Sequence, residues 1–134
     1  MKGQESFKYD FEKSQKMYGD FIDKCYQPFE GYRLTPNSEI SPYALCFAIF
    51  GKHLIGQIHS INNEIDFFNS LLRSNLKQYK SNCISLERDI HTDKGYLQLL
   101  CFTLSALSII DTLQDESLLE HVLPLIVDLS LIHI

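Results

Sequence analysis

The chain of 134 residues contains no tryptophan, and its six glycines are scattered rather than grouped. Neither a GxGxxG sequence nor a P-loop occurs, so the glycine-rich turns that hold nucleotide phosphates are missing. The four cysteines, Cys25, Cys46, Cys83 and Cys101, form no CxxC pair, which removes the usual zinc and thiol-redox spacings. These absences argue against nucleotide, zinc and disulfide-exchange chemistry.

The histidines are also poorly placed for catalysis or metal binding. None of the five belongs to an HExxH sequence, and His53 and His59, six residues apart, would lie on nearly opposite sides of a helix. Cys83 and His91 could form a nucleophile pair on paper, but nothing in the sequence would orient them or supply an oxyanion site. We therefore expect no catalytic residue, no metal site and no cofactor.

The first residues, MKGQESFKYDFEK, lack the apolar core of a signal peptide. We therefore expect a cytoplasmic protein with free thiols. Cys46 and Cys101 lie in apolar runs, so both are expected to be buried. The uncharged run at 95–110 has 16 residues, fewer than the roughly 20 that span a bilayer, so no membrane span is expected.

The N-terminal segment 6–25 has the pattern of an amphipathic helix. Its apolar stripe consists of Phe7, Phe11, Tyr18, Phe21, Ile22 and Cys25. Polar residues occupy the opposite face, so we expect this helix to lie on a core. A loop at 26–40, punctuated by Pro28, Gly31 and Pro36, is expected to follow it.

Two further segments are apolar nearly all round. The segment 43–55 follows Ser41 and Pro42, a pair typical of a helix start. The segment 94–113 is the most apolar part of the chain, and Thr92 or Asp93 is expected to cap it. Helices without a polar face must be enclosed by other elements, so we expect these two at the centre.

The other helices are expected at 61–79 and from Asp115 onwards, with a polar, weakly patterned segment at 81–93. Pro124 should end or kink the last helix, and the tail at 125–134 fits a helix or a strand. The sequence thus predicts a single domain over 1–134. Its fold class is all-α: a compact irregular bundle of about five helices with two central apolar helices.

The charges are distributed unevenly. The net charge is −5, and all 12 basic residues lie within 1–94, where 12 acidic residues balance them. The last 40 residues contain five acidic residues and no Lys or Arg: Asp111, Asp115, Glu116, Glu120 and Asp128. Such a surface could attract a cationic partner, although the acids could also simply keep an apolar region in solution.

A second predicted contact surface is the aromatic loop CYQPFEGYR at 25–33. It brings Tyr26, Phe29 and Tyr32 together beside Glu30, and aromatic residues in a loop are typical anchors of protein interfaces. The alternative is a loop that folds back over the helices.

The segments GYRLTPNSEISPYALCFAIF at 31–50 and GYLQLLCFTLSALSII at 95–110 resemble the helical-hairpin repeats of α/α-toroid proteins, such as prenyltransferases and terpene cyclases. The resemblance implies a fragment or small relative of an isoprenoid-type enzyme. However, the tryptophan frequent in those repeats is absent, and a toroid needs several repeats to close. The acids Asp111, Asp115 and Glu116 would be the metal-binding candidates, but a predicted helix break separates them.

In size, acidic charge and lack of catalytic residues, the chain resembles the small immunity proteins that accompany bacterial toxins, including those of contact-dependent growth inhibition. The resemblance implies a non-enzymatic protein that blocks a basic nuclease toxin domain, its carboxylates taking the place of nucleic-acid phosphates. We therefore expect a basic protein partner. No direct nucleic-acid binding is expected, because that requires a cationic face. A homodimeric helical regulator, paired through the apolar C-terminal tail, is the remaining alternative.

Overall fold

The computed structural model describes residues 2–114, with side chains described for 10–110. The elements are α1 (Lys2–Lys24), β1 (Tyr26–Gln27), β2 (Gly31–Tyr32), α2 (Pro42–Leu54), the 3-10 helix η1 (Ile58–Glu64), α3 (Ile65–Ser85) and α4 (Lys94–Gln114). This part of the chain is mostly helical, as the all-α prediction requires, with four α-helices and one short hairpin. The helix expected from Asp115 and the tail at 125–134 lie outside the described residues.

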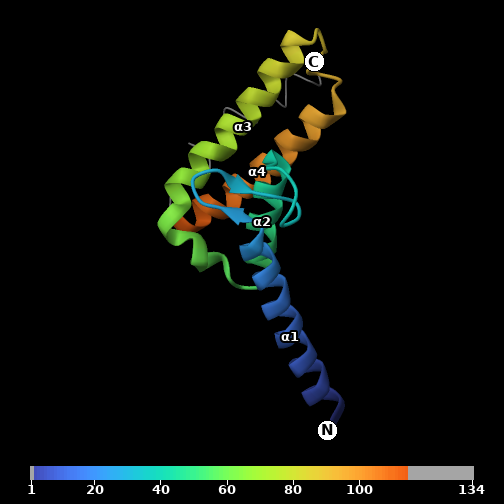
Figure 1. The fold of residues 1–134 in the computed structure, drawn as a ribbon, viewed down its shortest axis with the longest axis vertical. Coiled ribbons are helices and arrows are strands. Elements are labelled where there is room, and N and C mark those ends of the chain that lie inside the picture. The colour runs from blue at the N-terminus through green and yellow to red at the C-terminus, as the bar shows by residue number, and fades with distance from the viewer. Residues whose placement is uncertain (1, 115–134) are drawn as a thin grey trace.

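Helices α2, α3 and α4 form the helical core (Figure 1). Helices α3 and α4 run antiparallel and are joined by the segment 86–93, and α2 packs beside α4. The Tyr43 hydroxyl, at the start of α2, donates a hydrogen bond of 2.8 Å to the Gly95 carbonyl at the start of α4. The largest fully buried side chains all belong to these helices: Leu45, Ile49, Phe68, Leu72, Leu99, Leu100, Leu107 and Ile110.

The two predicted central helices are therefore α2 and α4, and their starts agree with the sequence. Ser41 occupies the N-cap position of α2 in an extended conformation, followed by Pro42, although its hydroxyl makes no capping bond. At α4 the cap is Asp93 rather than Thr92, because its carboxylate accepts a hydrogen bond of 2.8 Å from the Tyr96 amide.

Helix α3 differs from the prediction at both ends. It begins at Ile65, after a 3-10 segment, and continues to Ser85, through part of the region expected to be weakly patterned. It ends in a Schellman turn, in which the Arg88 amide donates to the Cys83 carbonyl and Glu87 has a φ of +59°. Glycine is usual at that position, so the end of this helix could not be predicted from the sequence.

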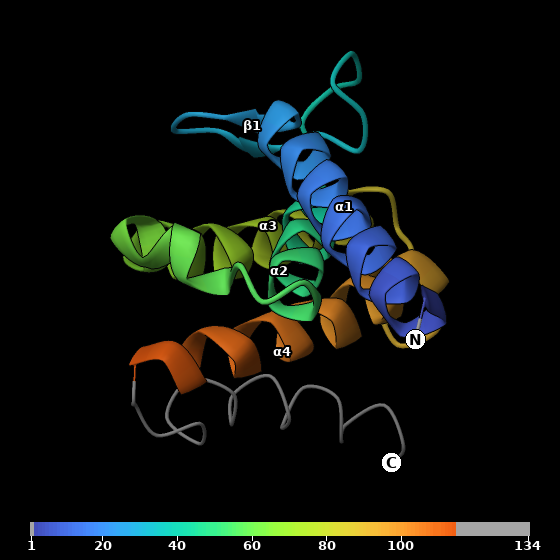
Figure 2. The ribbon, with the colours of Figure 1, turned by 90° about the horizontal axis from the view of Figure 1, so that it is seen from below.

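The loop expected at 26–40 contains a short antiparallel hairpin. Tyr26 pairs with Tyr32 and Gln27 with Gly31. Figure 2 shows the hairpin on one side of α2 and α3, with α4 on the other side. The hairpin thus covers the face of α3 that α4 leaves open.

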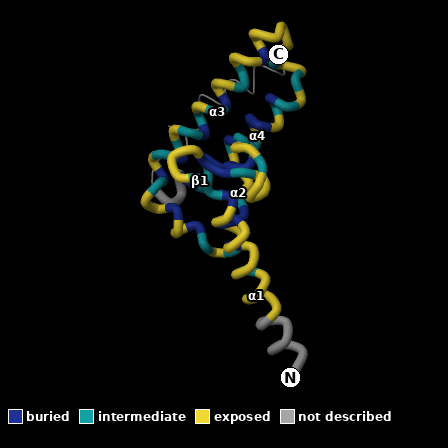
Figure 3. Tube along the Cα trace, viewed as in Figure 1, coloured by how far each residue is buried: buried dark blue, intermediate teal, exposed yellow. Residues whose placement is uncertain are grey.

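The expectation that the N-terminal helix lies on a core is wrong for most of α1. It projects away from the helical core toward its N-terminus (Figure 1), and its described part is largely exposed (Figure 3). Of the stripe residues whose side chains are described, Ile22 and the adjoining Cys25 are buried, whereas Phe11, Tyr18 and Phe21 are exposed. The reason is geometric, because only the last turns of α1 reach α2.

The four cysteines are free, and the prediction that Cys101 is buried is wrong. Cys46 is fully buried in α2, as expected, and burial raises the pKa of its thiol to about 11. Cys101 is exposed on α4, between buried Leu100 and half-buried Phe102. An apolar run does not show which of its residues faces away from the core.

Candidate functional site

The five acidic residues predicted to bind a basic partner lie at or beyond the end of the described structure. Asp111 is in the last turn of α4, but its side chain is outside the described residues. The other four, Asp115, Glu116, Glu120 and Asp128, lie wholly outside them. This surface therefore remains a prediction.

The aromatic loop is divided by the hairpin into an inner and an outer part. Tyr32 is buried, and its ring lies 5.1 Å from that of half-buried Tyr26 and 5.9 Å from that of Phe68 on α3. The Tyr26 hydroxyl donates to the Glu64 carboxylate, and burial together with this bond raises the pKa of Tyr26 to about 12. These two tyrosines fold back over the helices, which is the alternative left open by the sequence.

Phe29 and Glu30 form the outer part, at the hairpin tip (Pro28, Phe29 and Glu30). The Glu30 amide donates a hydrogen bond of 3.1 Å to the Gln27 carbonyl, which closes a tight turn. Pro28 is the second residue of this turn, and Phe29 is the third with a φ of +66°. This is the pattern of a type II turn, whose third position favours Gly or Asn. Phe29 is nevertheless a large apolar residue, 88% exposed.

Beside the hairpin, α1 and α2 enclose an apolar groove that the sequence did not indicate. It contains a pocket of about 240 Å³ with a buried floor, lined by residues of α1, β2, α2 and the segments that follow α1 and β2: Tyr18, Phe21, Ile22, Cys25, Tyr32, Arg33, Leu34, Ala44, Phe47 and Ala48. A more open pocket of about 530 Å³ adjoins it along α1, lined by Phe11, Ser14, Gln15, Tyr18, Leu54 and Ile55. Tyr18 lines both pockets and separates the one from the other. The sequence signal for this groove was the apolar stripe of α1, because the stripe extends further along the helix than α2 can cover.

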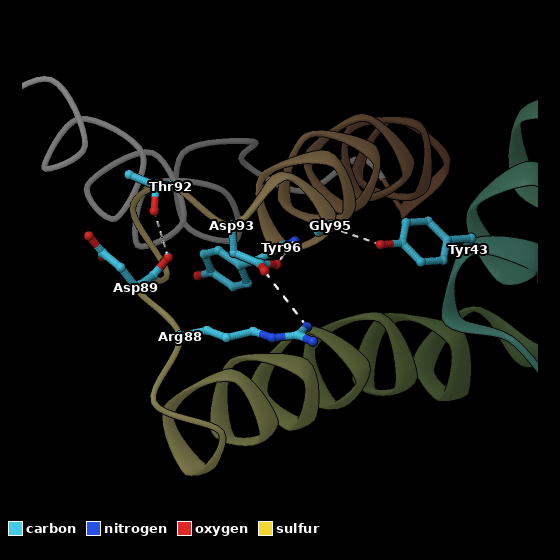
Figure 4. Close-up of polar contacts among 7 residues, drawn as sticks. All are labelled: Tyr43, Arg88, Asp89, Thr92, Asp93, Gly95 and Tyr96. Atoms are coloured by element: carbon cyan, nitrogen blue, oxygen red, sulfur yellow. Dashed lines mark hydrogen bonds and ion pairs between the residues drawn. The ribbon is translucent and has the colours of Figure 1, made fainter.

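A polar cluster surrounds the start of α4 (Figure 4). The Asp93 carboxylate caps the helix and lies 3.9 Å from the Arg88 guanidinium, while the Thr92 hydroxyl donates to the Asp89 carbonyl at 3.3 Å. A side chain at Gly95 would collide with the Tyr79 hydroxyl. The Asp93 cap and the bond from Tyr43 to the Gly95 carbonyl hold the start of α4 in place, so these contacts serve the fold.

The cysteine that could have served as a nucleophile is held in its neutral form. Cys83 is buried in α3, and burial raises the pKa of its thiol, as does the nearby Asp93 carboxylate. An activated cysteine requires the opposite shift. Within the described part of the chain, no group of three or more His, Cys, Asp or Glu side chains is arranged to hold a metal ion.

Across residues 2–114, no helix is both long enough and apolar enough to cross a membrane. Comparison with known proteins gives no further guide, because no protein family, curated protein or solved structure matches the chain.

Proposed function

We propose that this protein is a non-enzymatic protein-binding module that uses the hairpin tip as an anchor. The observation that supports this most strongly is Phe29, which is almost fully exposed and has a left-handed backbone conformation. Each property is unfavourable in the isolated chain, since non-glycine residues in this conformation cost about 1 kcal/mol or more. A partner that buries the Phe29 ring would gain free energy that offsets these costs.

The partner class that best fits the charges is a basic protein. Glu30 places a carboxylate beside Phe29, and the last 40 residues add five acidic residues without any Lys or Arg. An aromatic anchor with a carboxylate beside it is suited to steer and hold a cationic surface. We therefore propose an immunity protein, acting in the cytoplasm, that blocks a basic nuclease toxin domain.

The test places a photo-crosslinking phenylalanine at position 29 in cells of the source organism. A matched control carries it at Leu86, which is 65% exposed at the end of α3, far from the hairpin in the fold. We expect a discrete adduct with a basic protein at position 29 and none at position 86. The same adducts at both positions, or no adduct at position 29, would contradict the proposal.

The partner identified in this way permits a quantitative test. Replacing Phe29 by Gly should weaken binding at least tenfold, since aromatic anchors at interface centres contribute about 2 kcal/mol or more. The same change should leave the protein as stable or slightly more stable, because Gly adopts a positive φ without strain. Equal affinity of Phe29→Gly and the unmodified protein would refute the role of the tip.

A second candidate is a small relative of the α/α-toroid enzymes, and one observation favours it. Helix α2 contains residues 42–50 of the first segment with repeat character and α4 contains the second, and their starting ends are joined by the Tyr43–Gly95 bond. Repeat proteins stack such helical units against one another. Calorimetric titration with farnesyl diphosphate and Mg²⁺ distinguishes the candidates, because only the enzyme relative should bind the pair.

A further inference from the structure

Three exposed residues of α1 lie in one line along the helix. Asp10, Met17 and Lys24 are spaced seven residues apart, so each is rotated only about 20° from the next around the helix axis. Met17 is 62% exposed, and Asp10 and Lys24 are also exposed. Phe21, one turn after Met17, is exposed beside this line and extends it toward the α1–α2 groove.

The order of charges along this line is antisymmetric about Met17. The acid at position 10 precedes Met17 by the same distance by which the base at position 24 follows it. A second α1 laid antiparallel, with the two Met17 side chains meeting at the two-fold axis, would place Asp10 of each copy opposite Lys24 of the other. Such a surface is complementary to itself, which is the requirement for a closed two-fold dimer.

We propose that a second copy of this chain binds here, through an antiparallel pair of α1 helices centred on Met17. The observations that favour a second copy are the charge complementarity and the lack of competing ion-pair partners among the described side chains. Among described residues, neither Asp10 nor Lys24 makes an ion pair with another side chain. Met17 and Phe21 would supply the apolar centre of the interface, and Phe11 and Tyr18 lie toward its flank.

The dimer would be weak. From Asp10 to Lys24 the helix is about 21 Å long, so a single helix pair gives an interface at the small end of the specific range. Because the contact is two-fold, each charge pair occurs twice, and a single reversal changes two attractive pairs into repulsive ones. We therefore expect one reversal to raise the dissociation constant about tenfold.

The experiment is a charge swap, read by sedimentation equilibrium of the full chain over a wide range of protein concentration. Asp10→Lys and Lys24→Asp should each weaken dimerisation about tenfold, whereas the double variant D10K/K24D should restore the original dissociation constant. Met17→Glu should abolish the dimer, because it places two carboxylates together at the axis. Glu12→Lys, a reversal on the opposite side of α1, is the matched control and should change nothing.

The unmodified chain remaining monomeric at every concentration would overturn the proposal. So would a double variant as weak as the two single variants, since only pairing across the two-fold axis predicts the recovery. Circular dichroism of each variant confirms that helix content is unchanged, so a loss of dimer cannot result from unfolding. The inference does not depend on the hairpin tip, and crosslinking at position 29 can succeed or fail independently of it.

Discussion

Helices α1 and α4 both carry many apolar residues, but these side chains are mostly buried in α4 and mostly exposed in the described part of α1. In α4 the apolar side chains are buried between α2 and α3, and Leu99, Leu100, Leu107 and Ile110 are inaccessible to solvent. In α1 the stripe is covered only near its end, and Phe11 remains 57% exposed. The sequence pattern therefore predicted both helices, but burial depended on whether another element could reach them.

The difference separates residues that stabilise the fold from residues available for binding. Burying an apolar side chain of this size stabilises a protein by about 1.5–3 kcal/mol, and the α4 residues supply that stabilisation. The exposed residues of α1 and Phe29 supply little of it in the single chain. Exposed apolar residues commonly mark contact surfaces. The proposed function therefore uses Phe29, and the proposed dimer uses the exposed residues of α1.

The largest effect on the free energy of unfolding is expected from a substitution in α4, compared with a matched substitution in α1. Leu100→Ala should destabilise the protein by about 3 kcal/mol, because it leaves a cavity between packed helices. Phe11→Ala should change the free energy of unfolding by less than about 0.5 kcal/mol, although it removes the larger side chain. Urea denaturation of the two variants at low protein concentration measures both values. Equal destabilisation would show that α1 is packed in solution.

A smaller effect is expected where α1 is fastened to the helical core. The Lys52 ammonium of α2 is buried and donates hydrogen bonds to the Asp23 carboxylate at 2.6 Å and to the Ser60 hydroxyl at 3.0 Å. Asp23→Asn would leave this buried charge without its counterion, at a cost of about 1–3 kcal/mol.

Asp20→Asn is the matched control, since Asp20 is exposed on the same helix. Urea denaturation should show a cost for Asp23→Asn alone. A similar result for the two variants would mean that the Lys52–Asp23 pair does not hold α1 in place.

Much of the helical core could be predicted from the sequence, because its signals are local. The pair Ser41 and Pro42 indicated the start of α2, the uncharged run indicated α4, and Thr92 or Asp93 was the expected cap, which is Asp93. The end of α3 could not be predicted, because Glu87 takes a backbone conformation that usually requires Gly. The exposure of Cys101 could not be predicted either, since it depends on which face of α4 the other helices cover.

The candidate site was only partly visible in the sequence. The aromatic loop was recognised, but the division into inner Tyr26 and Tyr32 and outer Phe29 follows from the hairpin register and from contacts with α3. The α1–α2 groove was not predicted at all. It is formed by segments distant in the sequence, and its existence depends on how far α1 extends beyond α2.

The most direct test of this account is amide hydrogen exchange of α1 and α4 in the same sample, at low and at high protein concentration. The central claim is that the N-terminal half of the described α1 stripe, at 10–18, is left uncovered by the other described residues of a single chain. At low concentration we expect amides at 10–18 to exchange at least roughly 100-fold faster than those at 99–110, and at high concentration we expect α1 to gain protection while α4 stays unchanged. Equal protection of both helices in the dilute sample would contradict the claim.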